Sequence, residues 1–441
     1  MNTIFAPATA PGPAGVAVVR ISGPQAGEAL RRLAGALPAP RQAALRRLRS
    51  GPAGEILDQG LTLWFPRPRS FTGEDVAELH LHGGRATLRA VLDALRQMQG
   101  LRPAEPGEFT RRAFANGKLD LTQVEALADL VQAETEGQRR QAARQLEGGL
   151  GGRLERWRAE ILRALAHVEA AIDFAEDEVP AGAGTAAASQ VGRLEAEMAA
   201  ALAEAPRSER LRAGVHVAIV GPPNAGKSSL LNALAGRAAA IVSATAGTTR
   251  DVVEVHLDLG GVPVVLADTA GLCDSLDEIE EEGVRRALAR AEAADVRIAV
   301  LDAADWPRLD ARTLQAAGPA ALVVFNKIDI RYVPEPAFCG HDTFQLSATS
   351  GAGLDRFVTA LTARVQEAAG LSEEPGLTRA RHREAVAEGV GHLRRFLAGE
   401  GDVALRAEDL RLAVRALGRV TGRVDVEELL DVIFRDFCIG K

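Results

Sequence analysis

Residues 221–228 read Gly-Pro-Pro-Asn-Ala-Gly-Lys-Ser, which is the spacing of a phosphate-binding loop. They follow an apolar run at 215–220 and precede apolar residues at helical spacing. A glycine-rich turn between a strand and a helix directs backbone N–H groups and the positive end of the helix dipole at a phosphate. We therefore expect Lys227 to neutralise the terminal phosphates of a nucleotide and the Ser228 hydroxyl to bind Mg²⁺.

The segment Asn326-Lys327-Ile328-Asp329 indicates that the base of this nucleotide is guanine. It follows an apolar run at 321–325, so it should lie at the carboxyl end of a parallel strand, where doubly wound sheets bind ligands. There the Asp329 carboxylate can accept the ring N1–H and the exocyclic amine of guanine. Adenine has neither donor on that edge and would leave a desolvated carboxylate unpaired.

Two further segments follow apolar runs and agree with a guanine nucleotide site. Asp268-Thr269-Ala270-Gly271 should place Asp268 in the Mg²⁺ shell and the Gly271 backbone N–H near the γ-phosphate. Residues 347–349, Ser-Ala-Thr, should contact the base from its other side. The order of the four segments predicts a GTPase.

Hydrolysis requires a group that orients water. Many GTPases place a Gln directly after Asp-x-x-Gly, but this chain has Leu272, which cannot form hydrogen bonds with its side chain. Carboxylates are dense at 273–282, although most of them fit a solvated segment and the start of a helix. We expect Thr249 to bind Mg²⁺ and the γ-phosphate. Arg250, or a cation held by Asn224, could stabilise the developing charge.

Composition limits the class of protein. The chain has 441 residues, enough for two to four domains, and its formal charge of −7 provides no global field for nucleic acid. Arginines cluster at 41–49 and 139–144, where solvated faces are the simpler interpretation. The three cysteines are far apart in the sequence, residues 1–7 do not form a secretory signal, and no apolar stretch is long enough to span a membrane. These observations predict a cytoplasmic protein with reduced thiols.

The periodicity predicts a multidomain α/β and all-α chain. Residues 1–118 are mixed α/β, with strands expected at 15–21, 61–65 and 75–82. Residues 213–369 form a Ras-like doubly wound GTPase domain, inserted into a helical domain built from 119–212 and 370–441. The first expected helix begins at a Thr122-x-x-Glu125 capping box and runs towards residue 148, and the second carries an apolar stripe at 154–172. After a connector at 180–189, a third covers 191–205 and ends at Pro206. Three more are expected at 378–399, 403–418 and 425–437.

Several segments resemble the tRNA-modification GTPase family called MnmE or TrmE over essentially the whole chain. They are Arg-Ile-Ser-Gly at 20–23, Phe-Thr-Gly-Glu-Asp at 71–75, the blocks at 106–110 and 116–120, and the end Phe-Cys-Ile-Gly-Lys. The resemblance implies an enzyme that adds an aminomethyl or carboxymethylaminomethyl group to C5 of the wobble uridine of certain tRNAs. It also implies a heterotetramer with an FAD-dependent partner protein.

The same resemblance implies that the N-terminal domain binds the one-carbon donor, a 5-formyl- or methylene-tetrahydrofolate. Arg20, Glu78, Lys118 and Lys441 match that pocket. The residue types suit the ligand, because cations pair with the glutamate carboxylates of a folate and a carboxylate can bind the amide-like edge of the pterin.

For the GTPase domain, the resemblance implies a homodimer with K⁺ between phosphate loop and switch. Asn224, Ser243, Thr245 and Thr248 match its K⁺ ligands, and Glu280 matches the residue that orients water. The complete set of expected GTP-binding residues is Asn224, Ala225, Gly226, Lys227, Ser228, Ser229, Ser243, Thr245, Thr248, Thr249, Asp268, Thr269, Ala270, Gly271, Asn326, Lys327, Asp329, Ser347, Ala348 and Thr349.

Some alternatives stay open. Cys438 could be a nucleophile, but a partly buried thiol is the simpler interpretation, because reactivity needs a lowered pKa. His80 and His82 share a strand face, yet two ligands do not close a metal site. The chain could instead be a ribosome-assembly or RNA-binding switch GTPase. A third hypothesis makes the N-terminal domain an aminomethyl-transfer enzyme of its own.

Overall fold

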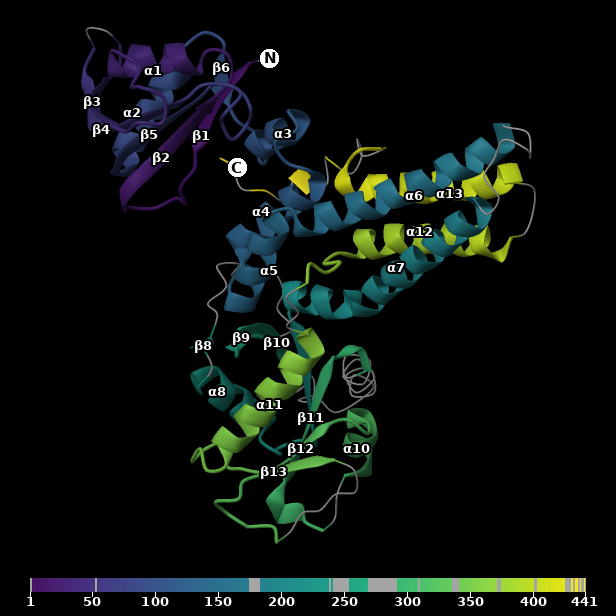
Figure 1. Cartoon of the computed structure of the whole chain (residues 1–441). Helices are drawn as coiled ribbons and strands as arrows, with labels where there is room; N and C mark the ends of the chain where they lie inside the picture. Colours follow the sequence, from purple (N-terminus) through teal and green to yellow (C-terminus); the bar gives the residue numbers. More distant parts are fainter. Residues whose placement is uncertain are drawn as a thin grey trace, which may run out of the picture. The chain divides into compact units, whose positions relative to one another are not determined.

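The computed structural model describes residues 2–51, 54–173, 183–237, 239–240, 254–268, 292–307, 310–334, 341–370, 374–399 and 403–424, with residues 430, 433–434, 437 and 440. These residues divide into two compact units. Unit 1 comprises residues 1–128 and 418–441, and unit 2 comprises residues 129–417. Each unit is described by itself, and Figure 1 gives the labels of their elements.

Unit 1 contains a six-stranded sheet in the order β3-β4-β5-β2-β1-β6. Its pairs are antiparallel, except that β1 and β6 run parallel. The strands are β1 (Thr3–Pro7), β2 (Ala14–Ser22), β3 (Ala44–Arg49), β4 (Ile56–Phe65), β5 (Val76–Gly83) and β6 (Leu101–Pro103). The strands expected at 15–21, 61–65 and 75–82 thus correspond to β2, β4 and β5.

The helices of unit 1 give the sheet its core. Helices α1 (Ala26–Ala34) and α2 (Arg85–Arg96) bury Leu30, Leu33 and Leu95 in one cluster with inward residues of the strands. Helix α3 (Glu108–Ala115) adds Phe109 to a second cluster with Ile4 and Ala6 of β1. Helix α4 begins at Leu121, which packs with Phe434 and Phe437 of the C-terminal segment.

Unit 2 contains a seven-stranded sheet in the order β13-β12-β11-β7-β10-β9-β8. Strands β13, β12, β11, β7 and β10 are parallel, and β9 and β8 join antiparallel at one side. The strands are β7 (Val215–Val220), β8 (Ala239–Ala240), β9 (Glu254–Leu259), β10 (Val262–Asp268), β11 (Val296–Asp302), β12 (Leu322–Asn326) and β13 (Asp342–Gln345).

Helices cover both faces of this sheet, as the doubly wound prediction requires. Helices α8 (Lys227–Arg237) and α11 (Leu354–Ala369) pack in one apolar cluster with the strands. Helix α10 (Ala311–Ala317) belongs to a second cluster with other residues of β7, β11 and β12. The predicted fold class is confirmed.

The remaining helices of unit 2 are long. They are α5 (Glu136–Leu146), α6 (Gly149–Asp173), α7 (Ala183–Ala213), α12 (Ala380–Ala398) and α13 (Val403–Thr421), whose last turn belongs to unit 1. Helix α7 packs on both α6 and α12. The stripe expected on α6 is confirmed for Leu154, Trp157, Ile161, Leu165 and Val168, which are all buried. The domain limits at 118, 212 and 369 stay predictions.

The expected capping box at Thr122 is wrong. Helix α4 (Leu121–Gln132) begins one residue earlier, and Asp120 caps it. The Gln123 N–H donates to Asp120 Oδ1 at 2.9 Å, and the Asp120 N–H donates to Gln123 Oε1 at 3.0 Å. The helix also ends at Gln132, and α5 begins with its own capping box from Thr135 to Gln138. The Asp120 carboxylate takes the cap because Asp is at least as good a cap as Thr.

The helix end expected at Pro206 is also wrong. Helix α7 continues through Pro206 to Ala213, and it begins at Ala183, inside the expected connector. Proline removes one helical hydrogen bond, but contacts beyond it hold the helix. Arg210 Nε donates to Asp295 Oδ1 at 2.6 Å, and Arg212 Nε donates to the Thr378 carbonyl at 2.9 Å. Tertiary contacts therefore override the local signal.

Most of the helix expected at 425–437 lies outside the described residues. Within the described part of the chain, no helix is long and apolar enough to cross a membrane.

Candidate nucleotide site and N-terminal pocket

The phosphate loop lies between the end of β7 and the start of α8. Asn224 and Gly226 have left-handed backbones, with φ of +63° and +94°. A Cβ on Gly226 would lie 2.1 Å from Asn326 Nδ2, so this position requires glycine. Lys227 Nζ donates to the carbonyls of Gly221 and Pro222 at 2.8 and 2.9 Å, which holds the ammonium over the loop.

Asn326 joins the phosphate loop to the segment at 347–349. Its side chain is buried, with 2% of the residue exposed. Its Nδ2 donates to the Ala225 carbonyl at 2.9 Å, and its Oδ1 accepts the Ala348 N–H at 3.0 Å. The amide thus bridges two loops that come from opposite ends of the GTPase segment.

Asp302 is a site residue that the sequence analysis missed. It ends β11, beside the end of β12, and its Oδ2 accepts a hydrogen bond from Lys327 Nζ at 2.7 Å. Partial burial acts to raise the pKa of Asp302, but hydrogen bonds from Lys327 and from the Ala304 N–H outweigh it and hold that pKa below its ordinary value. The available signal was an Asp at the end of an apolar run between Asp268 and Asn326.

The other expected base contacts lie in turns at the same edge of the sheet. Asp329 and Thr349 are exposed, as are Ser228 and Ser229 at the start of α8. Ser347 is buried, and its Oγ accepts the Ser350 N–H at 3.1 Å, so it shapes the turn. The carboxylate of Asp329 is therefore open to a base, while Ser347 supports the backbone.

Several expected site residues lie outside the described residues, and their roles stay predictions. They are Ser243, Thr245, Thr248, Thr249, Thr269, Ala270, Gly271, Glu280, Cys438 and Lys441. The backbone of Asp268 ends β10 next to Ile219 of β7, which brings that strand end to the phosphate loop.

In unit 1, Arg20 and Glu78 face each other across β2 and β5. Arg20 Nε donates to Glu78 Oε1 at 3.0 Å, and the guanidinium lies 5.2 and 5.9 Å from the ring centroids of Phe71 and Phe109. Lys118 Nζ donates to the Pro68 carbonyl at 3.1 Å, in the loop between β4 and β5. The structure therefore pairs two of the expected pocket residues and attaches the third to the adjacent loop.

The two histidines of β5 have different carboxylate neighbours. His80 Nε2 lies 3.4 Å from Glu78 Oε2, and His82 Nδ1 lies 2.7 Å from Asp58 Oδ1. Burial acts to raise the pKa of Asp58, but hydrogen bonds from His82 and Gln59 outweigh burial and hold that pKa below its ordinary value. Among the described residues, no cluster of three or more His, Cys, Asp or Glu could hold a metal ion.

The arginine cluster at 139–144 is partly neutralised. Arg139 and Arg140 both bind the Glu136 carboxylate, at 2.7 Å each. Hydrogen bonds from Arg139 and Arg140 lower the pKa of Glu136 to about 2. This agrees with the interpretation of the cluster as a solvated face.

Three features together define a P-loop GTPase domain. They are a mostly parallel sheet covered on both faces, a phosphate loop after β7 and the Asn-Lys-x-Asp segment after β12. The G domain of the T. maritima FeoB iron transporter is 26% identical and covers 35% of this chain and 98% of its own, with a TM-score of 0.26.

Comparison over the whole chain gives the family. A model described as MnmE helical domain matches residues 121–438, and one described as GTP-binding protein TrmE N-terminus matches residues 3–118. The tRNA modification GTPases MnmE of Paramagnetospirillum magneticum and Parvibaculum lavamentivorans are 59% and 58% identical, each over 100% of both chains. The chain belongs to the MnmE family of tRNA modification GTPases.

Proposed function

We propose that this GTPase is the GTP-hydrolysing subunit of an enzyme that modifies C5 of the wobble uridine in certain tRNAs. It acts with an FAD-dependent partner, adds an aminomethyl or carboxymethylaminomethyl group, and takes the carbon from a tetrahydrofolate derivative. Full-length relatives named tRNA modification GTPase favour this function over that of a ribosome-assembly GTPase. A reaction on tRNA agrees with a cytoplasmic location.

The observation that carries the proposal is the bridge made by Asn326. Its 2.9 Å hydrogen bond to Ala225 fixes the base-reading segment against the phosphate loop. One guanine nucleotide can then span both, with its phosphates at Lys227 and its base at Asp329. Because the bridge is buried, the distance between the two ends of the site is set before the nucleotide binds.

The donors in the described part of the loop suit the expected cations. Ser228 offers a hydroxyl at the start of α8, and Asn224 offers an amide oxygen in an exposed left-handed turn. Oxygen donors are those that Mg²⁺ prefers, and K⁺ in proteins is also bound by oxygen atoms. When bound, the two cations would stabilise the charge that develops on the phosphates. Lys227 would bind the β- and γ-phosphates, and Glu280 would orient the attacking water.

Unit 1 has the groups that a reduced folate needs. The Glu78 carboxylate, which Arg20 orients, can accept from the pterin edge, and the Phe71 ring offers apolar contact beside Arg20. Lys118 is anchored on the neighbouring loop. Lys441 would complete the set.

A homodimer is consistent with the exposed apolar side chains on the sheet of unit 1. Leu45 and Leu61 pair across β3 and β4 and are 58% and 42% exposed.

The proposal is tested by GTP turnover in matched potassium and sodium buffers. We expect hydrolysis to be faster in potassium and to disappear when GTP is replaced by ATP. Equal rates in both salts would contradict the role of K⁺ at Asn224. Titration calorimetry with 5-formyltetrahydrofolate on the full-length protein tests the folate site, and absence of binding would contradict the one-carbon role.

A further inference from the structure

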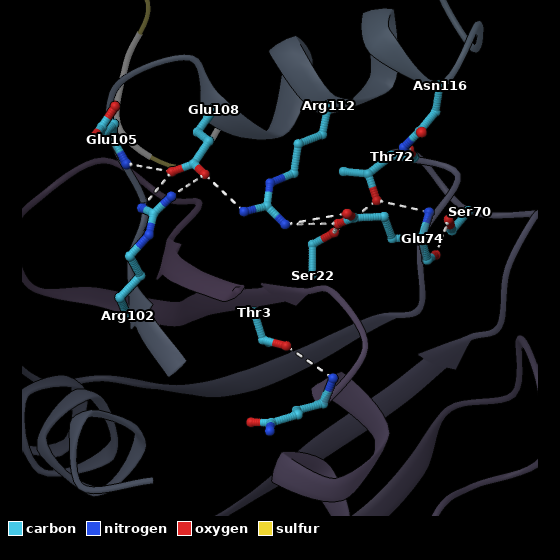
Figure 2. Close-up of polar contacts among 11 residues, drawn as sticks. Thr3, Ser22, Ser70, Thr72, Glu74, Arg102, Glu105, Glu108, Arg112 and Asn116 are labelled. Carbon is cyan, nitrogen blue, oxygen red and sulfur yellow. Dashed lines mark hydrogen bonds and ion pairs between the residues drawn. The ribbon is translucent and has the colours of Figure 1, made fainter. Parts of the chain in front are cut away.

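A row of ion pairs in unit 1 ties helix α3 to the loop between β4 and β5. Figure 2 shows Arg102, Glu108, Arg112 and Glu74 joined in sequence. Arg102 Nη2 and Arg112 Nη2 donate to Glu108 Oε1 at 2.6 and 2.8 Å. Arg112 Nη1 then reaches both oxygens of Glu74, at 3.2 and 3.1 Å. Arg112 therefore links a helix carboxylate to a loop carboxylate.

The loop end of this row is well buried and is attached to the sheet. The side chains of Arg112 and Glu74 are 12% and 13% exposed. Glu74 Oε2 accepts the Ser22 hydroxyl at 2.7 Å, and the Ser22 and Thr72 hydroxyls lie 2.7 Å apart (Figure 2). Asn116 Nδ2 adds a hydrogen bond to the Thr72 carbonyl at 2.7 Å. Loop residues 70–75 are thus held from both α3 and β2.

The place where the loop is held is next to Arg20. Ser22 is two residues beyond Arg20 on β2, so both side chains point to the same face of the sheet. The loop also carries Phe71, whose ring centroid lies 5.2 Å from the Arg20 guanidinium, and α3 carries Phe109, whose ring centroid lies 5.9 Å from it. A shift of the loop would therefore move one of the two rings that lie near Arg20.

We propose that Glu74 and Arg112 are positioning residues of the folate pocket, because their ion pair fixes the loop that places Phe71 against Arg20. Neither residue contacts the ligand in this proposal. The ion pair acts through the Phe71 ring and through the backbone of the same loop, where Lys118 donates to the Pro68 carbonyl. The inference rests on the proposed folate function of unit 1.

The test compares Glu74→Gln and Arg112→Lys with Arg102→Gln in the full-length protein. Glu74→Gln keeps the shape of the side chain and removes its charge, and Arg112→Lys cannot reach both carboxylates at once. Arg102→Gln is the matched control, because it breaks an ion pair of the same row that has no contact with the loop. Calorimetry with 5-formyltetrahydrofolate, melting temperature and GTP turnover are measured for each variant.

We expect Glu74→Gln and Arg112→Lys to weaken folate binding by about tenfold, as residues that orient a binding group typically do. Arg102→Gln should lower the melting temperature yet bind folate like the unchanged protein. GTP turnover should be the same in the three variants and the unchanged protein. Unchanged folate affinity in both loop variants would overturn the proposal. An equal loss in Arg102→Gln would also overturn it, since the row would then only support the fold.

A readout without ligand separates this inference from the proposed function. Hydrogen exchange of the backbone amides at 69–75 should become faster in Glu74→Gln and Arg112→Lys, and should stay unchanged in Arg102→Gln. If the unchanged protein binds no folate, the one-carbon role fails, while faster exchange would still show that the pair fixes the loop. Unchanged exchange would overturn the inference even where folate binds.

Discussion

The two candidate sites, one in each unit, are built with different kinds of contact. The nucleotide edge of unit 2 is built from strand ends, and one neutral amide, Asn326, links its two loops. The proposed folate site of unit 1 lies beside ion pairs that join charged side chains of β6, α3 and the loop after β4. In our proposal, one site is positioned mainly by backbone topology and the other by side-chain electrostatics.

This difference predicts different responses to mutation. A site positioned mainly by topology should be most sensitive to backbone shape and less sensitive to the charge of neighbouring side chains. A site positioned by ion pairs should respond to charge and to pH. The two kinds of substitution can therefore be compared in one protein.

The largest expected effect is that of Gly226→Ala on the nucleotide site. The new Cβ would lie 2.1 Å from Asn326 Nδ2, at a φ of +94° that alanine rarely adopts. We expect the affinity for GDP, measured by calorimetry, to fall by about a hundredfold or more, and folate binding to persist.

The control is Gly236→Ala in α8, where a Cβ meets nothing within 4 Å. That substitution should stabilise the helix by about 0.5–1 kcal/mol and leave GDP affinity unchanged. If both alanines had the same effect on GDP binding, backbone shape at Gly226 would not determine the affinity of the site.

The next effect is that of Glu108→Gln on the stability of unit 1. Glu108 is buried between Arg102 and Arg112, and removing one partner of such a group costs about 2–3 kcal/mol after allowance for its partial exposure. Chemical denaturation followed by Trp64 fluorescence, with the other tryptophans replaced, would measure the loss. A loss below about 0.5 kcal/mol would show that the row of ion pairs is not structural.

The same residue gives a pH dependence. Burial acts to raise the pKa of Glu108, but hydrogen bonds from Arg102, the Glu105 N–H and Arg112 hold it below the ordinary value of 4.5. The carboxylate therefore contributes stability above about pH 4.5, and that contribution is lost as the pH falls through the lowered pKa. Stability of the unchanged protein should decline more steeply in this acid range than that of Glu108→Gln. Parallel curves would contradict the assignment.

The contrast between the sites also explains what could be predicted from the sequence. Strands β7, β10 and β12 were predicted because each is an apolar run followed by a motif, and parallel strands bring such ends to one edge. Asp302 was missed because its pairing with Lys327 depends on β11 lying beside β12, which is a property of strand order. Glu74 and Arg112 are 38 residues apart, and no local pattern connects them. Pro206 misled because packing of α7 outweighs the local preference of proline.

Asp302→Asn tests whether side-chain charge matters at the nucleotide edge as well. The substitution weakens the hold on Lys327, whose backbone has a left-handed φ of +66°. We expect GDP affinity to fall by about tenfold, the size of a lost charge-assisted hydrogen bond. The control is Asp305→Asn, an exposed carboxylate three residues away. Equal affinities in the two variants would mean that backbone topology alone positions Lys327.

The smallest expected effect is that of Pro206→Ala, which lies outside both sets of contacts. Alanine would restore a backbone N–H inside α7 and remove the steric conflict of proline with the preceding turn. We expect unit 2 to gain about 1 kcal/mol in unfolding free energy, with GDP and folate affinities unchanged, because neither site uses this part of the helix. Calorimetric melting and the two titrations measure these quantities. A change in GDP affinity would show that α7 transmits strain to the nucleotide edge, and the separation of topology from side-chain contacts would then be incomplete in unit 2.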